Sequence, residues 1–289
     1  MDKEEKTTKT LQEVLAGIPH RLLGGREDLP LAGLSFDSRA VVPSGAFVAI
    51  EGTAADGHDY IDQAIRAGAC AVVLRKTPGE LHPGVSYVQV EDTSRALALM
   101  ARAFYDNPTS RIALVGVTGT NGKTTTATLL YQVFRSMGYR CGLFSTVENI
   151  LGEEHIPARQ TTPDILTLNA SLDRMARQGC THCFMEVSSH ALAQQRVAGL
   201  DFRGAIFSNL THDHLDYHKT FAGYRDAKKR LFDSLAPDAF ALVNADDRNG
   251  AYMLQNTRAH KYTYSLASVS DFMARILEST FEGMELEID

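Results

Sequence analysis

The chain alternates between short apolar runs and longer segments in which apolar residues recur at helical spacing. The short runs predict buried strands, and the longer segments predict amphipathic helices. From residue 111 onward the two patterns follow one another regularly, which is typical of βαβ units around a mostly parallel sheet with helices on both faces. The strands expected there are Ile112–Val117, Gly142–Thr146, Cys183–Val187, Ala205–Asn209 and Phe240–Asn244, with helices at about 123–137, 163–178 and 220–234.

Residues 1–107 predict a separate α/β domain. Asn107-Pro108 ends its last helix, because the residue before a proline disfavours helical geometry, and we place the domain boundary there. The chain is therefore expected to contain two domains, 1–107 and 108–289. In the first domain, strands are expected at Phe47–Ile50, Ala71–Leu74 and Tyr87–Val90, and helices at His58–Gly68 and Thr93–Tyr105.

Two end signals add detail to the second domain. Thr162 and Pro163 suit the N-cap and the first position of the helix that follows them. Phe272–Glu278 and Met284–Ile288, joined around Gly283, predict a β-hairpin, and no element follows to close it. We therefore expect the second domain to be incomplete at its C-terminal end.

The composition is that of an ordinary soluble globular protein, with 44% hydrophobic and 22% charged residues. The net charge of −6 and the absence of a Lys/Arg-rich tract argue against a nucleic-acid partner. No apolar segment approaches the length of a membrane span or resembles a signal peptide, so we expect a cytoplasmic protein with no membrane partner. We also expect a monomer. Four cysteines fit a reducing compartment, and the Cys180-x-x-Cys183 pair is interpreted as structural thiols.

The sequence Gly116-Val-Thr-Gly-Thr-Asn-Gly-Lys-Thr-Thr-Thr126 lies between a predicted strand and a predicted helix. A glycine-rich turn at a helix start presents backbone N–H groups to phosphate. Lys123 would reach the β- and γ-phosphates, and the Thr124 hydroxyl would reach Mg²⁺. Val117 stands where the strict P-loop pattern has its first glycine, so the spacing indicates a particular subfamily of nucleoside-triphosphate-binding proteins.

Polar residues gather just after other predicted strands. Glu186 closes an apolar strand, where a carboxylate is costly unless it is paired or binds a metal. Residues 211–218 hold three histidines and two aspartates. Zinc is possible there, but Mg²⁺ is favoured because no H-E-x-x-H spacing is present. The sequence Asn244-Ala-Asp-Asp247 suits either a nucleotide contact or a plain turn.

Taken together, these segments resemble the Mur ligases, and most closely the MurE type. The resemblance rests on Asp37-Ser-Arg39, Asp56-Gly-His58, the glycine-rich loop, Thr161-Thr-Pro163, Glu186-Val-Ser-Ser-His190, Asn209-Leu-Thr-His-Asp-His-Leu-Asp-Tyr-His218 and Ala227-Lys-Lys-Arg-Leu-Phe232. It implies an N-terminal UDP-binding domain followed by a P-loop central domain. It also implies an ATP-dependent amide ligase of peptidoglycan precursor synthesis. Such a ligase adds diaminopimelate or lysine to UDP-MurNAc-L-Ala-D-Glu through an acyl phosphate.

The same resemblance implies roles for individual residues. The uridine nucleotide would bind at Ser38, Thr53 and Ala54, and the muramoyl dipeptide at Thr161, Thr162, Ser188, Gln194 and Arg196. ATP would bind at Gly119, Thr120, Asn121, Gly122, Lys123, Thr124, Thr125 and Asn209. The Mg²⁺ ligands would be Thr124, Glu186, His214 and Lys228, the last as a carbamate formed with CO₂. Lys123, Lys228 and His214 would be catalytic.

Members of this family carry a third domain that binds the incoming amino acid, and the resemblance does not extend to it. We therefore expect that the chain alone binds its substrates without completing ligation. Two alternatives stay open: a sister ligase of the MurF type, and a non-catalytic nucleotide-binding module. A P-loop GTPase is disfavoured because the chain has no Asn-Lys-x-Asp motif.

Overall fold

The structure is a computed structural model that describes residues 8–52, 55–213, 215–281 and 283–289. Its residues form two compact units. The first comprises residues up to Pro108 together with Asp164–Asp173 and Gln195–Leu200, and the second comprises the remainder. The proposed division into domains at residues 107 and 108 stays a prediction.

The first unit is built on a five-stranded sheet with the order β2-β7-β6-β5-β4. Strands β4 to β7 are parallel, and β2 is antiparallel to β7. Phe47, Val72, Leu74 and Tyr87 are fully buried in its core. The strands are β1 Lys9–Thr10, β2 His20–Gly24, β3 Pro30–Leu31, β4 Leu34–Ser35, β5 Gly45–Val48, β6 Ala69–Leu74 and β7 Ser86–Val90; the helices are α1 Leu11–Val14, η1 Gly57–Tyr60, α2 Ile61–Arg66 and α3 Thr93–Phe104.

The second unit is built on a sheet with the order β11-β10-β9-β12-β8-β13-β14-β15-β16-β17. The inner strands, which follow one another in the order β9, β12, β8, β13, β14, β15 and β16, are parallel to their neighbours. The outer strands β10, β11 and β17 pair antiparallel with theirs. The mostly parallel sheet expected from the βαβ rhythm is therefore confirmed. Its strands are β8 Ala113–Thr118, β9 Cys141–Phe144, β10 Glu148–Leu151, β11 Glu154–Pro157, β12 His182–Glu186, β13 Phe202–Phe207, β14 Phe240–Asn244, β15 His260–Ser265, β16 Phe272–Ser279 and β17 Met284–Ile288.

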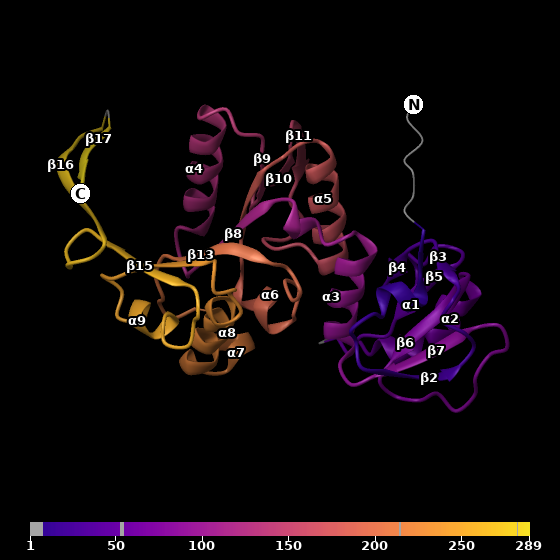
Figure 1. The fold of residues 1–289 in the computed structure, drawn as a ribbon. Helices are drawn as coiled ribbons and strands as arrows, with labels where there is room; N and C mark the ends of the chain where they lie inside the picture. Colours follow the sequence, from indigo (N-terminus) through magenta and orange to yellow (C-terminus); the bar gives the residue numbers. More distant parts are fainter. Residues whose placement is uncertain (1–7, 53–54, 214, 282) are drawn as a thin grey trace. The chain divides into compact units, whose positions relative to one another are not determined.

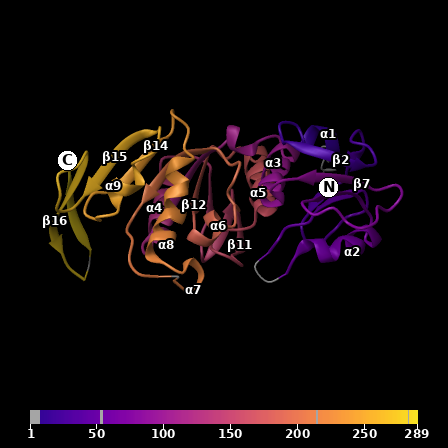
Figure 2. The ribbon, with the colours of Figure 1, turned by 90° about the horizontal axis from the view of Figure 1, so that it is seen from below.

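Helices cover both faces of this sheet. Helix α4 packs on β8, β9 and β12, while α6, α7 and α9 pack with α8 on the other side (Figure 1). β14 and β15 lead at one end into the hairpin of β16 and β17 (Figure 2). The helices of this unit are α4 Lys123–Ser136, α6 Ser189–Ala193, α7 Leu215–His218, α8 Phe221–Asp233 and α9 Gly250–Met253. Helix α5 Ile165–Arg177 belongs to the first unit as far as Asp173, and η2 spans Pro108–Ser110.

The fold corrects one local prediction and adds several elements, among them the strand β15 and the hairpin of β10 and β11. Helix α5 begins at Ile165, and the Asp164 carboxylate accepts the N–H groups of Leu166 and Thr167, so Thr162 is not its N-cap. The hairpin of β10 and β11 was not expected from the sequence. Its strands mix polar and apolar residues at the sheet edge, so they lack the continuous apolar run that revealed the inner strands.

Candidate nucleotide site

The glycine-rich loop joins the end of β8 to the start of α4. A Cβ atom on Gly119 would lie 2.0 Å from the Ser208 hydroxyl, so only glycine fits there. Gly122 is the N-cap residue of α4, has φ +82°, and provides no side-chain cap. The first-turn N–H groups of a helix have no partner within the helix. This helix start is therefore suited to bind an anion.

The loop is held in place by β13 and the residues after it. Asn209 Oδ1 accepts the Asn121 N–H at 3.0 Å, and the Asn209 amide donates to the Asn121 carbonyl at 3.1 Å. The Ser208 hydroxyl donates to the same carbonyl at 2.7 Å. These bonds fix the loop before any ligand arrives, which reduces the entropy that binding must overcome.

A cavity of about 270 Å³ lies beside the loop, at the carboxyl ends of β8, β9 and β12. Ligands in parallel α/β sheets bind at this edge. Hydroxyl, carboxylate and ammonium groups line it, as a site for a charged ligand requires. Its lining residues are Thr120, Asn121, Gly122, Lys123, Thr124, Thr146, Thr161, Glu186, Ser188, Ser189 and Lys228.

Two lysines converge on the loop from different helices. Lys123 Nζ donates to the Gly119 and Thr120 carbonyls at 2.9 and 2.8 Å, and Lys228 Nζ donates to the Gly119 carbonyl at 2.8 Å. Burial lowers the pKa of both ammonium groups. For Lys228, which is 1% exposed, burial and the nearby Lys123 charge bring the pKa to about 7. Lys228 therefore loses its proton more readily than an exposed lysine does.

The neighbouring lysine has a different environment. Lys229 Nζ forms an ion pair with the Asp233 carboxylate one helical turn later on α8. It is not among the residues that line the cavity. The structure therefore distinguishes two adjacent lysines that the sequence alone presents as equivalent.

Glu186 places a carboxylate in the cavity wall at the end of β12. The residue is 1% exposed, and its oxygens accept the Thr146 backbone N–H at 2.6 Å and the Thr146 hydroxyl at 3.2 Å. These two donors partly satisfy the carboxylate. A buried carboxylate that faces a polar cavity suits a cation or a cationic group.

A sequence model described as the Mur ligase middle domain matches residues 117–289. The chain belongs to the Mur ligase family. A second model, described as the Mur ligase family catalytic domain, matches residues 30–105. Together the two matches extend over both units of this Mur ligase chain.

Two curated relatives of this Mur ligase chain carry the same name. A diaminopimelate-adding UDP-N-acetylmuramoyl-L-alanyl-D-glutamate ligase from Bacteroides fragilis is 52% identical over 96% of this chain and 58% of its own length. The enzyme of that name from Cytophaga hutchinsonii is also 52% identical, over 92% of this chain and 55% of its own length. The chain thus spans little more than half the length of these relatives. The resemblance to the MurE type is confirmed.

Solved structures agree with these sequence relationships. The structure of a UDP-N-acetylmuramoyl-L-alanyl-D-glutamate–2,6-diaminopimelate ligase superposes with a TM-score of 0.83 at 29% identity, covering 98% of this chain and 57% of the other. MurF from Acinetobacter baumannii has a TM-score of 0.66 at 17% identity, which shows a shared fold alone. None of the helices in the described part of this Mur ligase chain has the length and apolar composition that crossing a bilayer requires.

The structure gathers many of the residues that the sequence singled out. Lys123, Glu186 and Lys228 line one cavity with the loop residues. Ser188 lines it as well. Thr162 lies beside it, where its hydroxyl donates to the Glu186 carbonyl at 2.8 Å and accepts the Ser188 N–H at 3.1 Å. Thr161 and Thr124 line the wall directly. Their proposed roles stay predictions.

Other predicted residues lie elsewhere. Asn209 holds the loop from behind, and Thr125 is an exposed residue of α4 outside the cavity lining. The Gln194 amide donates to the Tyr217 hydroxyl at 3.4 Å. Ser38, which is buried, and Arg196 belong to the first unit. Three predicted site residues, Thr53, Ala54 and His214, lie outside the described residues.

The sequence interpretation missed two residues of the cavity. Thr146 follows β9 and binds Glu186, and the Ser189 hydroxyl is buried with no hydrogen-bond partner in the described part of the chain. Thr146 could have been found by its place at the end of a predicted strand. Its link to Glu186 required knowledge that β12 lies next to β9 in the sheet.

Proposed function

We propose that this chain binds ATP with Mg²⁺ and UDP-MurNAc-L-Ala-D-Glu. The longer protein of its relatives' length would add diaminopimelate to that dipeptide. The observation that carries this proposal is the cavity in which the glycine-rich loop, Lys123, Lys228 and Glu186 meet. Cationic donors at a helix N-terminus suit a triphosphate. A buried carboxylate beside them suits its magnesium ion.

The donor set fits Mg²⁺ as the expected cofactor. Thr124 and Glu186 would supply oxygen ligands. The family resemblance adds an imidazole nitrogen from His214, which lies outside the described residues. Lys228 fits less well as an ammonium, because its positive charge would repel the ion. As a neutral amine it is nucleophilic toward CO₂: a C–N bond would form, a proton would leave the nitrogen, and the carbamate would present one negative charge shared by two oxygens. When bound, Mg²⁺ would neutralise charge on the phosphates.

The ligation would proceed in two steps. The glutamyl carboxylate attacks the γ-phosphorus of ATP, forming an acyl phosphate and releasing ADP. The amine of diaminopimelate then attacks the acyl carbon, and phosphate leaves. In the first step Lys123 would hold the γ-phosphoryl oxygens and the helix start would orient them. The contribution of the protein is therefore positioning and electrostatics.

The test is calorimetric titration of the 289-residue chain. We expect selective binding of UDP-MurNAc-L-Ala-D-Glu over the UDP-tripeptide, and Mg²⁺-dependent binding of ATP that Lys123→Ala weakens at least about tenfold, as expected for the loss of a charge-assisted contact. Preference for the tripeptide would instead indicate the MurF type. Binding of ATP with neither UDP compound would favour a nucleotide-binding module.

A further inference from the structure

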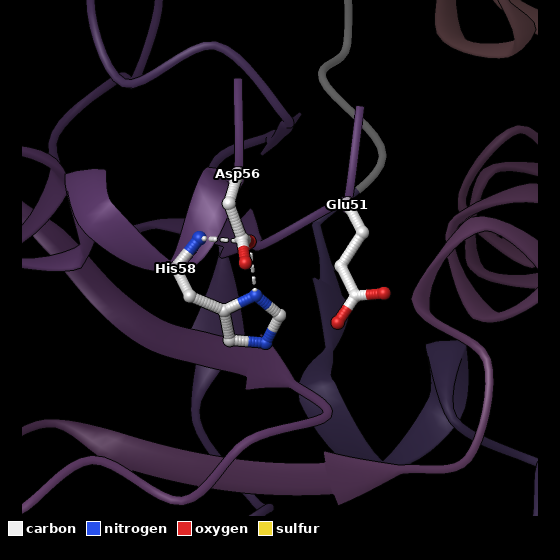
Figure 3. Close-up of side chains that lie close together, drawn as sticks. All are labelled: Glu51, Asp56 and His58. Carbon is white, nitrogen blue, oxygen red and sulfur yellow. Dashed lines mark hydrogen bonds and ion pairs between the residues drawn. The ribbon is translucent and has the colours of Figure 1, made fainter. Parts of the chain in front are cut away.

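One cluster of side chains in the first unit has the composition of a metal site but contains its own cation. Glu51, Asp56 and His58 lie close together (Figure 3), and each offers a ligand atom within 4.8 Å of the others. The Lys76 ammonium lies 2.7 Å from Asp56 Oδ2 and 3.0 Å from Glu51 Oε1, and His58 Nδ1 lies 2.6 Å from Asp56 Oδ1. These contacts describe an ion-pair network of the chain itself.

In the second unit, a buried tyrosine contacts the glycine-rich loop from α8. Tyr224 is fully buried, and its hydroxyl lies 3.1 Å from the Thr120 hydroxyl, where either group can donate. Thr120 lines the cavity, whereas Tyr224 is not among the lining residues. An influence of Tyr224 on a ligand in the cavity would therefore act through the residues that it contacts.

The Thr120 hydroxyl joins the loop to two other parts of this unit. It accepts the Thr211 N–H at 3.0 Å and donates to the Thr211 carbonyl at 3.4 Å, and on its other side it meets the Tyr224 hydroxyl. A hydroxyl has one proton and two lone pairs. When the Tyr224 hydroxyl donates, these three contacts use the full capacity of Thr120 and hold its side chain in one orientation.

Helix α8 brings Tyr224 and Lys228 to the same loop. The two residues are one helical turn apart, and Lys228 Nζ lies 4.7 Å from the centre of the Tyr224 ring. Lys228 Nζ also donates to the Gly119 carbonyl at 2.8 Å. Two side chains of one helix therefore bond to the consecutive loop residues Gly119 and Thr120, so the loop is tied to α8 at two points.

We propose that Tyr224 is a positioning residue of the nucleotide site: its hydroxyl holds Thr120, and with it the glycine-rich loop, in the conformation that binds Mg²⁺-ATP. The inference rests on the proposed function, which places the ATP phosphates at this loop. A loop that is free to adopt other conformations binds more weakly, in proportion to the fraction of molecules in the competent one. Removing the Tyr224 hydroxyl therefore weakens ATP binding although Tyr224 does not line the cavity.

The experiment measures the Mg²⁺-ATP affinity of the 289-residue chain by calorimetry. Tyr224→Phe keeps the buried ring and removes only the hydroxyl, so we expect it to weaken ATP binding about threefold to tenfold, as for one lost hydrogen bond. Tyr264→Phe is the matched control, because the Tyr264 hydroxyl donates to the Phe207 carbonyl at 3.3 Å in the same unit and Tyr264 does not line the cavity. Its ATP affinity should equal that of the wild type.

A double-mutant cycle shows whether the effect passes through Thr120. Thr120→Val removes the partner of the Tyr224 hydroxyl, so Tyr224→Phe should add little further loss of ATP affinity when both changes are present. An equal loss from Tyr224→Phe in the wild-type and Thr120→Val backgrounds would overturn the proposal. Unchanged affinity in Tyr224→Phe alone would also overturn it.

Hydrogen exchange tests the same inference without ATP. The Thr120 N–H donates to the Asn209 carbonyl at 2.8 Å. In Tyr224→Phe this amide should exchange faster, while the amides of the central strand β12 keep their protection. Faster exchange throughout the unit would indicate general destabilisation and would overturn a positioning role. Failure of the wild type itself to bind ATP would instead refute the proposed function.

Discussion

Lys123 and Lys228 donate to one acceptor, the carbonyl oxygen of Gly119, at 2.9 and 2.8 Å. Two ammonium groups held this close repel each other, and the Lys123 charge is one reason why the pKa of Lys228 falls to about 7. The arrangement therefore favours a neutral or negatively charged Lys228.

Lys228→Ala tests whether this amine binds CO₂. We expect the wild type to take up ¹³CO₂ and to show a carbamate signal by ¹³C NMR, since its neutral amine is nucleophilic. Lys228→Ala should lose the signal, and its Mg²⁺-ATP affinity should become independent of bicarbonate. Lys229→Ala is the control, because Lys229 is paired with Asp233 instead. A carbamate signal that survives Lys228→Ala and disappears in Lys229→Ala would show that Lys229, and not Lys228, forms the carbamate.

Gly119→Ala and Gly122→Ala separate steric contact from backbone strain. Both glycines have positive φ, but only Gly119 has a neighbour in the place of a Cβ atom, the Ser208 hydroxyl at 2.0 Å; Gly122 has nothing within 4 Å. Gly119→Ala should cost about 1–3 kcal/mol of stability beyond the strain that both share. Urea unfolding of the two variants measures the difference. Equal losses would show that Ser208 moves aside freely.

Much of the second unit was predictable because its inner strands are apolar on both faces. Phe184 and Met185 form such a run, and the structure places them in a central strand. The polar hairpin β10–β11 has no such run, and sequence reasoning missed it. The ends of elements were also less certain: Asp164, not Thr162, caps α5. Composition alone does not decide which of two nearby polar residues provides a cap.

The parts of the site that a short sequence motif forms were predictable. The loop geometry follows from Gly119, Gly122 and Lys123, which are close in sequence. The roles of Lys228 and Lys229 were harder to separate, although the Lys229–Asp233 spacing of one helical turn offered a signal. The contact between Thr146 and Glu186 was not predictable, because it depends on strand order: β12 lies between β9 and β8 in the sheet.

Thr146→Val tests the support of Glu186. The substitution keeps the shape and the backbone N–H bond but removes the hydroxyl that donates to Glu186 at 3.2 Å. Groups that orient metal ligands typically change metal affinity by about 10–100-fold, so we expect Mg²⁺-dependent ATP binding to weaken by about tenfold. Thr181→Val, at an exposed residue of the same unit, is the control. Unchanged affinity in Thr146→Val would show that the backbone N–H alone orients Glu186.

Asp246 gives a pH prediction outside the cavity. Its carboxylate accepts the N–H groups of Leu266, Ala267 and Ser268, at 2.7, 3.2 and 2.8 Å, so Asp246 anchors the loop after β15. Its hydrogen bonds to Ser268 and Leu266 lower the pKa of the carboxyl from 3.8 to about 2.

A carboxyl whose pKa is lower in the folded state contributes stability above its unfolded pKa, and this contribution disappears as pH falls through the folded value. The stability advantage of wild type over Asp246→Asn should therefore be constant above about pH 5 and shrink between about pH 4 and 2. Thermal unfolding of both proteins across this range measures it. Asp238→Asn is the control, because Asp238 belongs to an exposed surface ion pair with Arg203. An Asp246→Asn difference that stays constant down to pH 2 would show that the turn needs only the shape of the side chain and not its charge.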